Sequence, residues 1–340
     1  MLIGHQKQWN FLKKTFEGNR LSHAYLFCGL ELLGKKTLAQ EFIKLLNCQE
    51  EKAEKKPCGN CNYCKMIEKR SYPDFLLIEP DKPPHQNIGS GGKESDSIQI
   101  FQIRELQHFL SFRSYYGQWK AAIIDNAEKM TKDSQSCLLK TLEEPKEKTI
   151  LILVSSYPDL LLATIYSRCQ TVKFFPVKRE DIKKYLLKQG TDEKKAELLA
   201  ESSQGRPGRA ISFFREPDLL EKEGQLLKKF LSVFRSDIAS RFEFVKNLTS
   251  SDPSPSAKGE GLDKFLLLLE GDLRSILLFK TKATRPSDFY LLASSLKEFD
   301  SYPISKLEKS IKLLENIIFQ RTFTNINPRL ALELLMLEIE

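Results

Sequence analysis

The chain has 340 residues, of which 41% are hydrophobic and 29% charged, and its formal net charge is +8. This length predicts two or three domains, and no stretch reaches the ~18 uncharged apolar residues of a membrane span. The N-terminus also lacks the apolar core and small-residue cleavage site of a secretory signal, so we expect a cytoplasmic protein without membrane contact. The mild positive charge permits contact with nucleic acid or an acidic partner but requires neither.

The first half of the chain alternates short apolar runs with helical patterns. Such an alternation predicts a parallel sheet covered by helices, because parallel strands need helical crossovers. The polar tract between residues 82 and 97 predicts a surface loop within this region. The five predicted strands are His23–Gly29, Asp74–Pro80, Lys120–Asn126, Thr149–Ser155 and Thr171–Pro176.

After Pro176 the strand signals end and amphipathic helical patterns follow. A stretch rich in Ser, Pro and Gly, Ser250–Gly261, predicts a linker or a long exposed loop, and further helices follow it. We therefore expect an α/β domain over residues 1–177, a small helical domain over 178–216 and a helical bundle over 217–340.

The segment after the first predicted strand nearly matches a phosphate-binding loop. Gly29, Gly34 and Lys35 satisfy the first seven positions of G-x-x-x-x-G-K-[ST]. The eighth position should carry the hydroxyl that binds magnesium, but Lys36 stands there and Thr37 follows one residue late. Backbone N–H groups and Lys35 could still hold phosphates, so the sequence leaves ATP or ADP binding open.

A second nucleotide-site signal follows the third predicted strand. Asp125 stands where a magnesium-orienting carboxylate belongs. In AAA+ ATPases the next residue is a glutamate that activates water, but here it is Asn126, whose amide cannot accept a proton. Glu128 comes two residues later and is expected to be a surface residue.

Four of the seven cysteines are clustered with the spacing C-x9-C-x2-C-x2-C. An odd number of cysteines without an export signal argues against a disulfide framework, and C-x2-C turns suit tetrahedral zinc. Four reduced thiols or an iron–sulfur cluster are the alternatives. Because four protein ligands would leave no open position, the sequence predicts a structural zinc module at about residues 48–64. Its ligands would be Cys48, Cys58, Cys61 and Cys64, whereas small core residues are predicted for Cys28, Cys137 and Cys169.

Three segments together resemble the clamp-loader ATPase family of DNA replication. They are IIDNAEKM, then CLLKTLEEP at Cys137–Pro145, then LLLATIYSRCQ at Leu160–Gln170. The four-cysteine insert narrows the resemblance to the bacterial DNA polymerase III clamp loader. Within that complex, the incomplete phosphate-binding loop resembles that of the delta-prime type of subunit. The resemblance spans about residues 1–214, and the terminal bundle matches only in length and helicity.

The resemblance implies an AAA+ P-loop domain, a lid domain and a collar-type bundle for oligomerisation. It assigns Arg168 as an arginine finger that reaches the ATP of a neighbouring subunit. Ser155 and Ser156 would stand at the first sensor position. At the second sensor, motor subunits have an arginine where this chain has Gly208, and Arg209 is displaced by one residue, about 100° on a helix.

The implied function is that of a structural, or stator, subunit that helps to load the sliding clamp onto primed DNA. It would have no ATPase activity of its own within the DNA polymerase III holoenzyme, a DNA-directed DNA polymerase and thus a nucleotidyltransferase. The implied partners are gamma/tau-type ATPase and delta-type subunits in a heteropentamer, and through them the sliding clamp and primer-template DNA. Two alternatives are an active gamma/tau-like motor ATPase that uses Thr37 for magnesium, and a zinc-stabilised DNA-binding protein.

Overall fold

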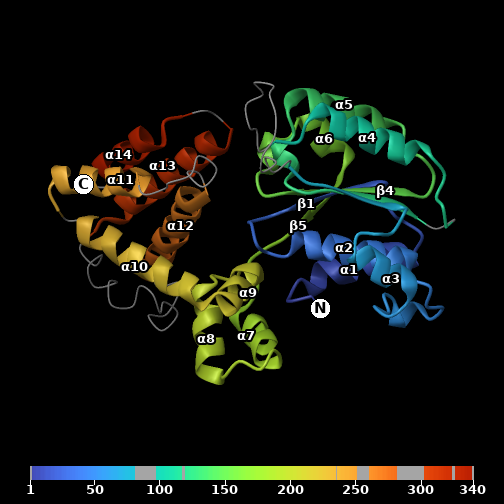
Figure 1. The fold of residues 1–340 in the computed structure, drawn as a ribbon, viewed down its shortest axis with the longest axis horizontal. Helices are drawn as coiled ribbons and strands as arrows, with labels where there is room; N and C mark the ends of the chain where they lie inside the picture. Colours follow the sequence, from blue (N-terminus) through green and yellow to red (C-terminus); the bar gives the residue numbers. More distant parts are fainter. Residues whose placement is uncertain are drawn as a thin grey trace. The chain divides into compact units, whose positions relative to one another are not determined.

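The chain is described here from a computed structural model (Figure 1). It forms two compact units, residues 1–182 with 205–208, and residues 183–204 with 209–340. The three-part division expected from the sequence stays a prediction. Most of the predicted surface loop at 82–97 and of the predicted linker at 250–261 lies outside the described residues. The structure describes residues 2–80, 97–116, 119–234, 236–250, 260–281, 302–323 and 326–338.

The first unit is built on a five-stranded parallel sheet with the strand order β2-β3-β4-β1-β5. Every residue of β1 and β3 is buried, as expected for central strands covered on both faces. All five predicted strands and their parallel pairing are confirmed. The strands are β1 (Ala24–Cys28), β2 (Phe75–Ile78), β3 (Lys120–Ile124), β4 (Thr149–Ser155) and β5 (Gln170–Lys173).

Helices cover both faces of this sheet (Figure 1). One apolar core joins α1, α2 and α3 to one face, and a second core joins α4, α5 and α6 to the other. Cys28, Cys137 and Cys169 lie in or against the second core, as predicted. The helices are α1 (Gln6–Glu17), α2 (Lys35–Asn47), α3 (Asn62–Glu68), α4 (Ile100–Ser111), α5 (Lys132–Glu143) and α6 (Ala163–Arg168), with short 3-10 turns η1 (Ala53–Lys55), η2 (Ala127–Lys129) and η3 (Pro158–Leu160).

The parallel arrangement gathers the candidate site at one edge of the sheet. In a parallel sheet all carboxyl ends of the strands lie at the same edge, where α/β proteins bind ligands. The glycine loop follows β1, Asp125 follows β3, and Ser155 ends β4, which lies between them. The fold therefore brings residues separated by more than a hundred positions into one site.

The second unit is helical throughout its described residues. Helix α7 (Arg179–Lys188) crosses from the first unit into it, and α9 (Pro207–Arg215) does so again. Phe230, Phe244 and Phe265 form an aromatic cluster with ring centroids 5.9–6.4 Å apart. The remaining helices are α8 (Glu193–Ser202), α10 (Pro217–Phe234), α11 (Ile238–Ser250), α12 (Glu260–Lys280), α13 (Ile304–Phe323) and α14 (Pro328–Glu338).

A buried arginine ties two of the terminal helices together. Arg241 on α11 is 8% exposed, and its Nη1 donates to the backbone oxygen of Met336 on α14 over 3.1 Å. Among the helices that the structure describes, none is long and apolar enough to cross a lipid bilayer.

Candidate functional site

The glycine loop has the local geometry expected from the sequence. It follows β1, and α2 begins at Lys35. Gly34 caps this helix with φ 87°, a left-handed conformation that glycine adopts without the steric cost of a Cβ. The first N–H groups of a helix lack intrahelical partners, so the loop retains the backbone arrangement of a phosphate cradle.

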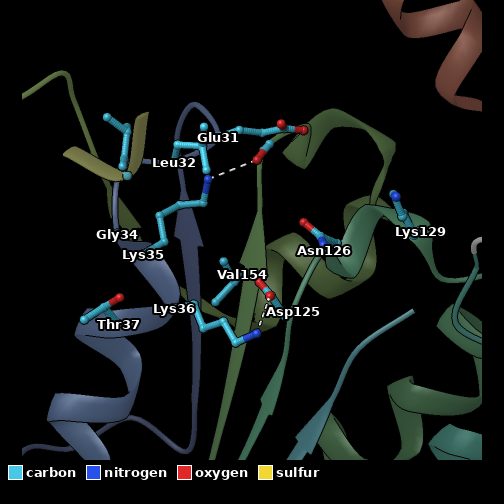
Figure 2. Close-up of a pocket in the computed structure, with 13 residues that line it drawn as sticks. Glu31, Leu32, Gly34, Lys35, Lys36, Thr37, Asp125, Asn126, Lys129 and Val154 are labelled. Atoms are coloured by element: carbon cyan, nitrogen blue, oxygen red, sulfur yellow. Dashed lines mark hydrogen bonds and ion pairs between the residues drawn. The ribbon is translucent and has the colours of Figure 1, made fainter. Parts of the chain in front are cut away.

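A cavity of about 470 Å³ opens over this loop (Figure 2). It includes residues after β3 and β4 in addition to the loop itself, which is the arrangement of a nucleotide site. Its lining consists of Glu31, Leu32, Leu33, Gly34, Lys35, Lys36, Thr37, Asp125, Asn126, Lys129, Val154, Ser156 and Gly208.

Lys35 is turned toward its own loop. Its ammonium donates to the backbone oxygens of Gly29 at 2.5 Å and Leu30 at 2.7 Å, and to Ser156 Oγ at 3.0 Å. An ammonium has three N–H donors, so each has an acceptor within the protein. Lys35 is 5% exposed, and this burial lowers its pKa to about 8. The charge that would meet a phosphate is therefore held by protein oxygens.

Lys36 lies on the carboxylate that would orient magnesium. Its Nζ is 3.0 Å from Asp125 Oδ2 and also pairs with Glu79 Oε1 (Figure 2 shows the Asp125 pair). Glu79 in turn pairs with Arg70 Nη1 at 2.8 Å. Burial opposes ionisation of Glu79, but Lys36 and Arg70 outweigh it and hold its pKa below the ordinary value. Asp125, which the sequence predicts as a magnesium-orienting carboxylate, is thus paired with a cation of the protein itself.

The two remaining catalytic positions also differ from those of an ATPase. Thr37 lines the cavity but lies apart from Asp125 in Figure 2. Asn126 adopts φ 51°, a left-handed conformation that asparagine tolerates better than most residues. Neither residue supplies a magnesium ligand beside Asp125 or a base for water.

The expectation for Glu128 is wrong, because this residue is buried rather than at the surface. It is 5% exposed, and its Oε1 accepts from the backbone N–H of Ser156 over 3.1 Å. Burial raises the pKa of Glu128 despite hydrogen bonds from Ser155 and Ser156 and the nearby charge of Lys35. The left-handed turn at Asn126 starts the 3-10 helix that contains Glu128. The sequence shows only the residue type at this turn, an asparagine, which tolerates the left-handed conformation better than most residues.

Ser155 and Ser156, which the resemblance predicts at the first sensor position, are connected to the loop and to Glu128. Ser156 joins Lys35 to Glu128, since its Oγ accepts from one and its N–H donates to the other. Ser155 is fully buried, and its Oγ accepts from the backbone N–H of Tyr157 over 3.1 Å. Both serines therefore support the packing of the loop with its own lysine.

Gly208 contacts the glycine loop directly. Its N–H donates to the backbone oxygen of Leu32 over 2.8 Å, and a Cβ at this position would lie 2.9 Å from that oxygen. Arg209 is engaged elsewhere, because its guanidinium donates to Gln204 at 3.1 Å and pairs with Glu223 at 2.8 Å. A side chain at position 208 would therefore collide with the loop, and the neighbouring Arg209 is held by other residues.

Arg168 has a different environment from the cations of the loop. It ends α6, and its side chain is 36% exposed. Its Nη2 lies 2.8 Å from Glu143 Oε1 and its Nη1 donates to the backbone oxygen of Thr164 over 3.2 Å. The side chain of Arg168 is therefore partly exposed, unlike the buried Lys35.

The four clustered cysteines meet in space. One Sγ from each lies within 4.8 Å of the others, compared with about 3.8 Å between thiolates around tetrahedral zinc. Backbone N–H groups donate to three of the sulfurs at 3.3–3.4 Å, as suits thiolates. The donor set therefore fits one metal ion, held at the end of α2 and the start of α3 by Cys48, Cys58, Cys61 and Cys64.

Comparisons with known proteins agree with this picture. A family model described as DNA polymerase III, delta subunit, matches residues 4–178. The DNA polymerase III subunit delta' of Bacillus subtilis is 34% identical over 266 residues, 78% of this chain and 75% of the relative. The subunit tau/gamma of Haemophilus influenzae is 33% identical over 168 residues, 49% of this chain and 22% of the relative.

Among solved structures, a gamma subunit-related protein of DNA polymerase III from Thermotoga maritima matches with a TM-score of 0.44 and 20% identity, over 98% of each chain. The family assignment rests on the sequence matches, which cover most of the chain and include the strands, the loop and the cysteine cluster. The chain belongs to the DNA polymerase III delta' subunit family and is a clamp-loader subunit of that family.

Proposed function

We propose that this chain is a non-hydrolysing, structural subunit of the clamp loader. The observation that carries the proposal is the position of Lys36, whose ammonium pairs with Asp125 where a catalytic magnesium would be bound. Nucleotide hydrolysis at such loops depends on a divalent ion that bridges the phosphates. The amide of Asn126 and the contact of Gly208 with Leu32 support the same conclusion.

The chain would contribute to hydrolysis by a neighbour instead. We assign Arg168 as an arginine finger for ATP bound to a gamma/tau-type subunit. A planar guanidinium suits a γ-phosphate whose charge spreads over three oxygens, and such fingers accelerate turnover by ~10³–10⁵. The partly exposed side chain of Arg168 supports this role.

We also propose that the four-cysteine cluster holds structural zinc. Zinc would supply charge neutralisation for four thiolates and would fasten the segment between Cys48 and Cys64 to the end of α2. With all four positions taken by protein ligands, the ion would have no position for water or substrate.

The proposed partners are gamma/tau-type and delta-type subunits in a heteropentamer. Through this complex the chain would act on the sliding clamp and on primer-template DNA, in the cytoplasm. Co-purification of these subunits with the tagged chain tests the assembly. A chain that stays monomeric when expressed with them would contradict it.

Arg168→Ala tests the assigned finger. In the reconstituted complex, this change should lower the DNA-stimulated ATPase rate while assembly stays intact. The loss should equal the part of the total rate that comes from the ATP site that Arg168 contacts. An unchanged rate in a fully assembled complex would refute the role.

The active-motor alternative is tested separately with the purified chain alone. Magnesium-dependent ATP turnover that disappears with Lys35→Ala would favour the motor function over the structural one.

A further inference from the structure

The carboxylate that contacts Arg168 comes from the end of a neighbouring helix. Glu143 is the last residue of α5, and Arg168 is the last residue of α6. The two helices pack side by side in the second core of the first unit. The pair is thus set by two packed elements and not by a flexible loop.

Glu143 occupies a position that a helix alone disfavours. A carboxylate in the last turn meets the negative end of the helix dipole, which is unfavourable. Arg168 compensates for it with an Nη2–Oε1 distance of 2.8 Å. The adjacent Glu144 makes no ion pair with any residue that the structure describes, so the two consecutive glutamates differ in this respect.

The two contacts of Arg168 orient the guanidinium but use only some of its N–H donors. Of its five N–H donors, one is engaged by Glu143 and one by the backbone oxygen of Thr164. Two contacts on different nitrogens define the plane of the group, and the side chain remains 36% exposed. Among the residues that the structure describes, Arg168 makes no further polar contact, so its other N–H donors can meet an anion from outside the chain.

We propose that Glu143 is a positioning residue for Arg168. It holds the guanidinium in the orientation in which Arg168 meets the terminal phosphate of a nucleotide bound by an adjacent subunit. This inference rests on the proposed finger role of Arg168. Holding an arginine before the phosphate arrives reduces the conformational entropy that its ordering costs.

The size of the effect follows from the exposure of the pair. An ion pair at the surface contributes ~0.2–1 kcal/mol, which corresponds to a factor of about 1.4–5 in rate. This is too weak to compete with a multiply charged phosphate for the guanidinium. Glu143 should therefore help Arg168 to reach the phosphate and should not keep the guanidinium away from it.

Glu143→Gln in the reconstituted complex tests the proposal, with Glu144→Gln as the matched control. We expect Glu143→Gln to lower kcat of the DNA-stimulated ATPase about 1.4–5-fold with KM for ATP unchanged, and Glu144→Gln to behave as the wild type. Glu143→Asp, which keeps the charge, should recover part of the rate. In the Arg168→Ala background, Glu143→Gln should have no further effect.

The results separate the inference from the function on which it rests. If Arg168→Ala leaves the rate unchanged, the finger role itself fails. If Arg168→Ala lowers the rate but Glu143→Gln equals Glu144→Gln or raises the rate, the positioning role fails alone. A further loss from Glu143→Gln in the Arg168→Ala background would also overturn it, because Glu143 would then act by another route. Thermal unfolding of each purified variant shows whether it is folded.

Discussion

Lys35 and Lys36 in the loop after β1 are surrounded by protein acceptors, whereas Arg168 at the end of α6 has only part of its donors engaged. Lys35 contacts three oxygens of its own unit, and Lys36 pairs with Asp125 and Glu79. The side chain of Arg168 is 36% exposed, whereas Lys35 is buried. The loop has the shape of a phosphate site while its cations contact the chain's own oxygens, and Arg168, the cation that we propose acts on another molecule, lies elsewhere.

Removal of the proposed zinc should have the strongest effect of the changes considered. The effect should be confined to the cysteine segment and the end of α2 and should not reach α5 and α6. Apparent zinc binding at four-thiolate sites amounts to ~10–16 kcal/mol. Cys61→Ser should therefore abolish bound zinc and raise hydrogen exchange in residues 48–64 and at the end of α2. Exchange in α5 and α6, which carry the Arg168 pair, should not change.

Cys137→Ser is the control for that experiment, because Cys137 lies outside the cluster and is half-buried. It should retain zinc, as measured by metal analysis of the purified chain. Equal zinc content in Cys61→Ser and Cys137→Ser would contradict a metal site at the cluster.

The burial of Lys35 should make stability depend on alkaline pH. Its pKa is about 8 in the folded chain against 10.5 for a free lysine, so the unfolded state binds more protons between these values. Stability should therefore rise with pH across this window by up to about 3 kcal/mol, and below pH 8 Lys35 should add no slope. Urea unfolding of the wild type and of Lys35→Met at pH 7.5 and 10 measures how the free energy of unfolding changes with pH. An equal change in both proteins would show that Lys35 is not buried as a charge.

A side chain at position 208 should disturb the loop. Alanine normally favours a helix over glycine by about 1 kcal/mol, yet Gly208→Ala should destabilise the chain by about 1–2 kcal/mol, because the Cβ approaches the Leu32 oxygen to 2.9 Å. Gly208→Arg, which restores the sensor residue, should lose at least as much and gain no ATP affinity. A stabilised Gly208→Ala in thermal unfolding would rule out the close contact.

Loss of Lys36 should open the metal position. Lys36→Ala leaves Asp125 without its cation and should cost about 1 kcal/mol. Millimolar magnesium should then raise the melting temperature of Lys36→Ala but not of the wild type, whereas Lys36→Arg, which keeps the charge, should not respond. If magnesium stabilises the wild type equally, Lys36 does not substitute for the metal.

The strands and the loop could be predicted because their signals are local. Each strand is a short apolar run, and the loop and the cysteine cluster each have a characteristic spacing. The replacement of a hydroxyl by Lys36 is also visible in the sequence, but its pairing with Glu79 depends on how β1 and β2 are ordered in the sheet.

The positions that sequence reasoning missed depend on backbone geometry or on distant contacts. The sequence predicts Glu128 at the surface because it stands two residues beyond the catalytic position, but Asn126 adopts φ 51° and Glu128 is buried. The pair of Glu143 and Arg168 joins two helix ends 25 positions apart, and no spacing rule links them. The contact of Gly208 with the loop likewise required the folded chain.

The most direct test compares the two regions within one assembled complex. DNA-stimulated ATP turnover should be measured with this chain carrying either Lys35→Ala or Arg168→Ala. We predict that Arg168→Ala lowers turnover and that Lys35→Ala leaves it at the wild-type level, because the proposed function assigns no chemistry to the loop. A loss with Lys35→Ala and none with Arg168→Ala would contradict the proposed division between the two regions.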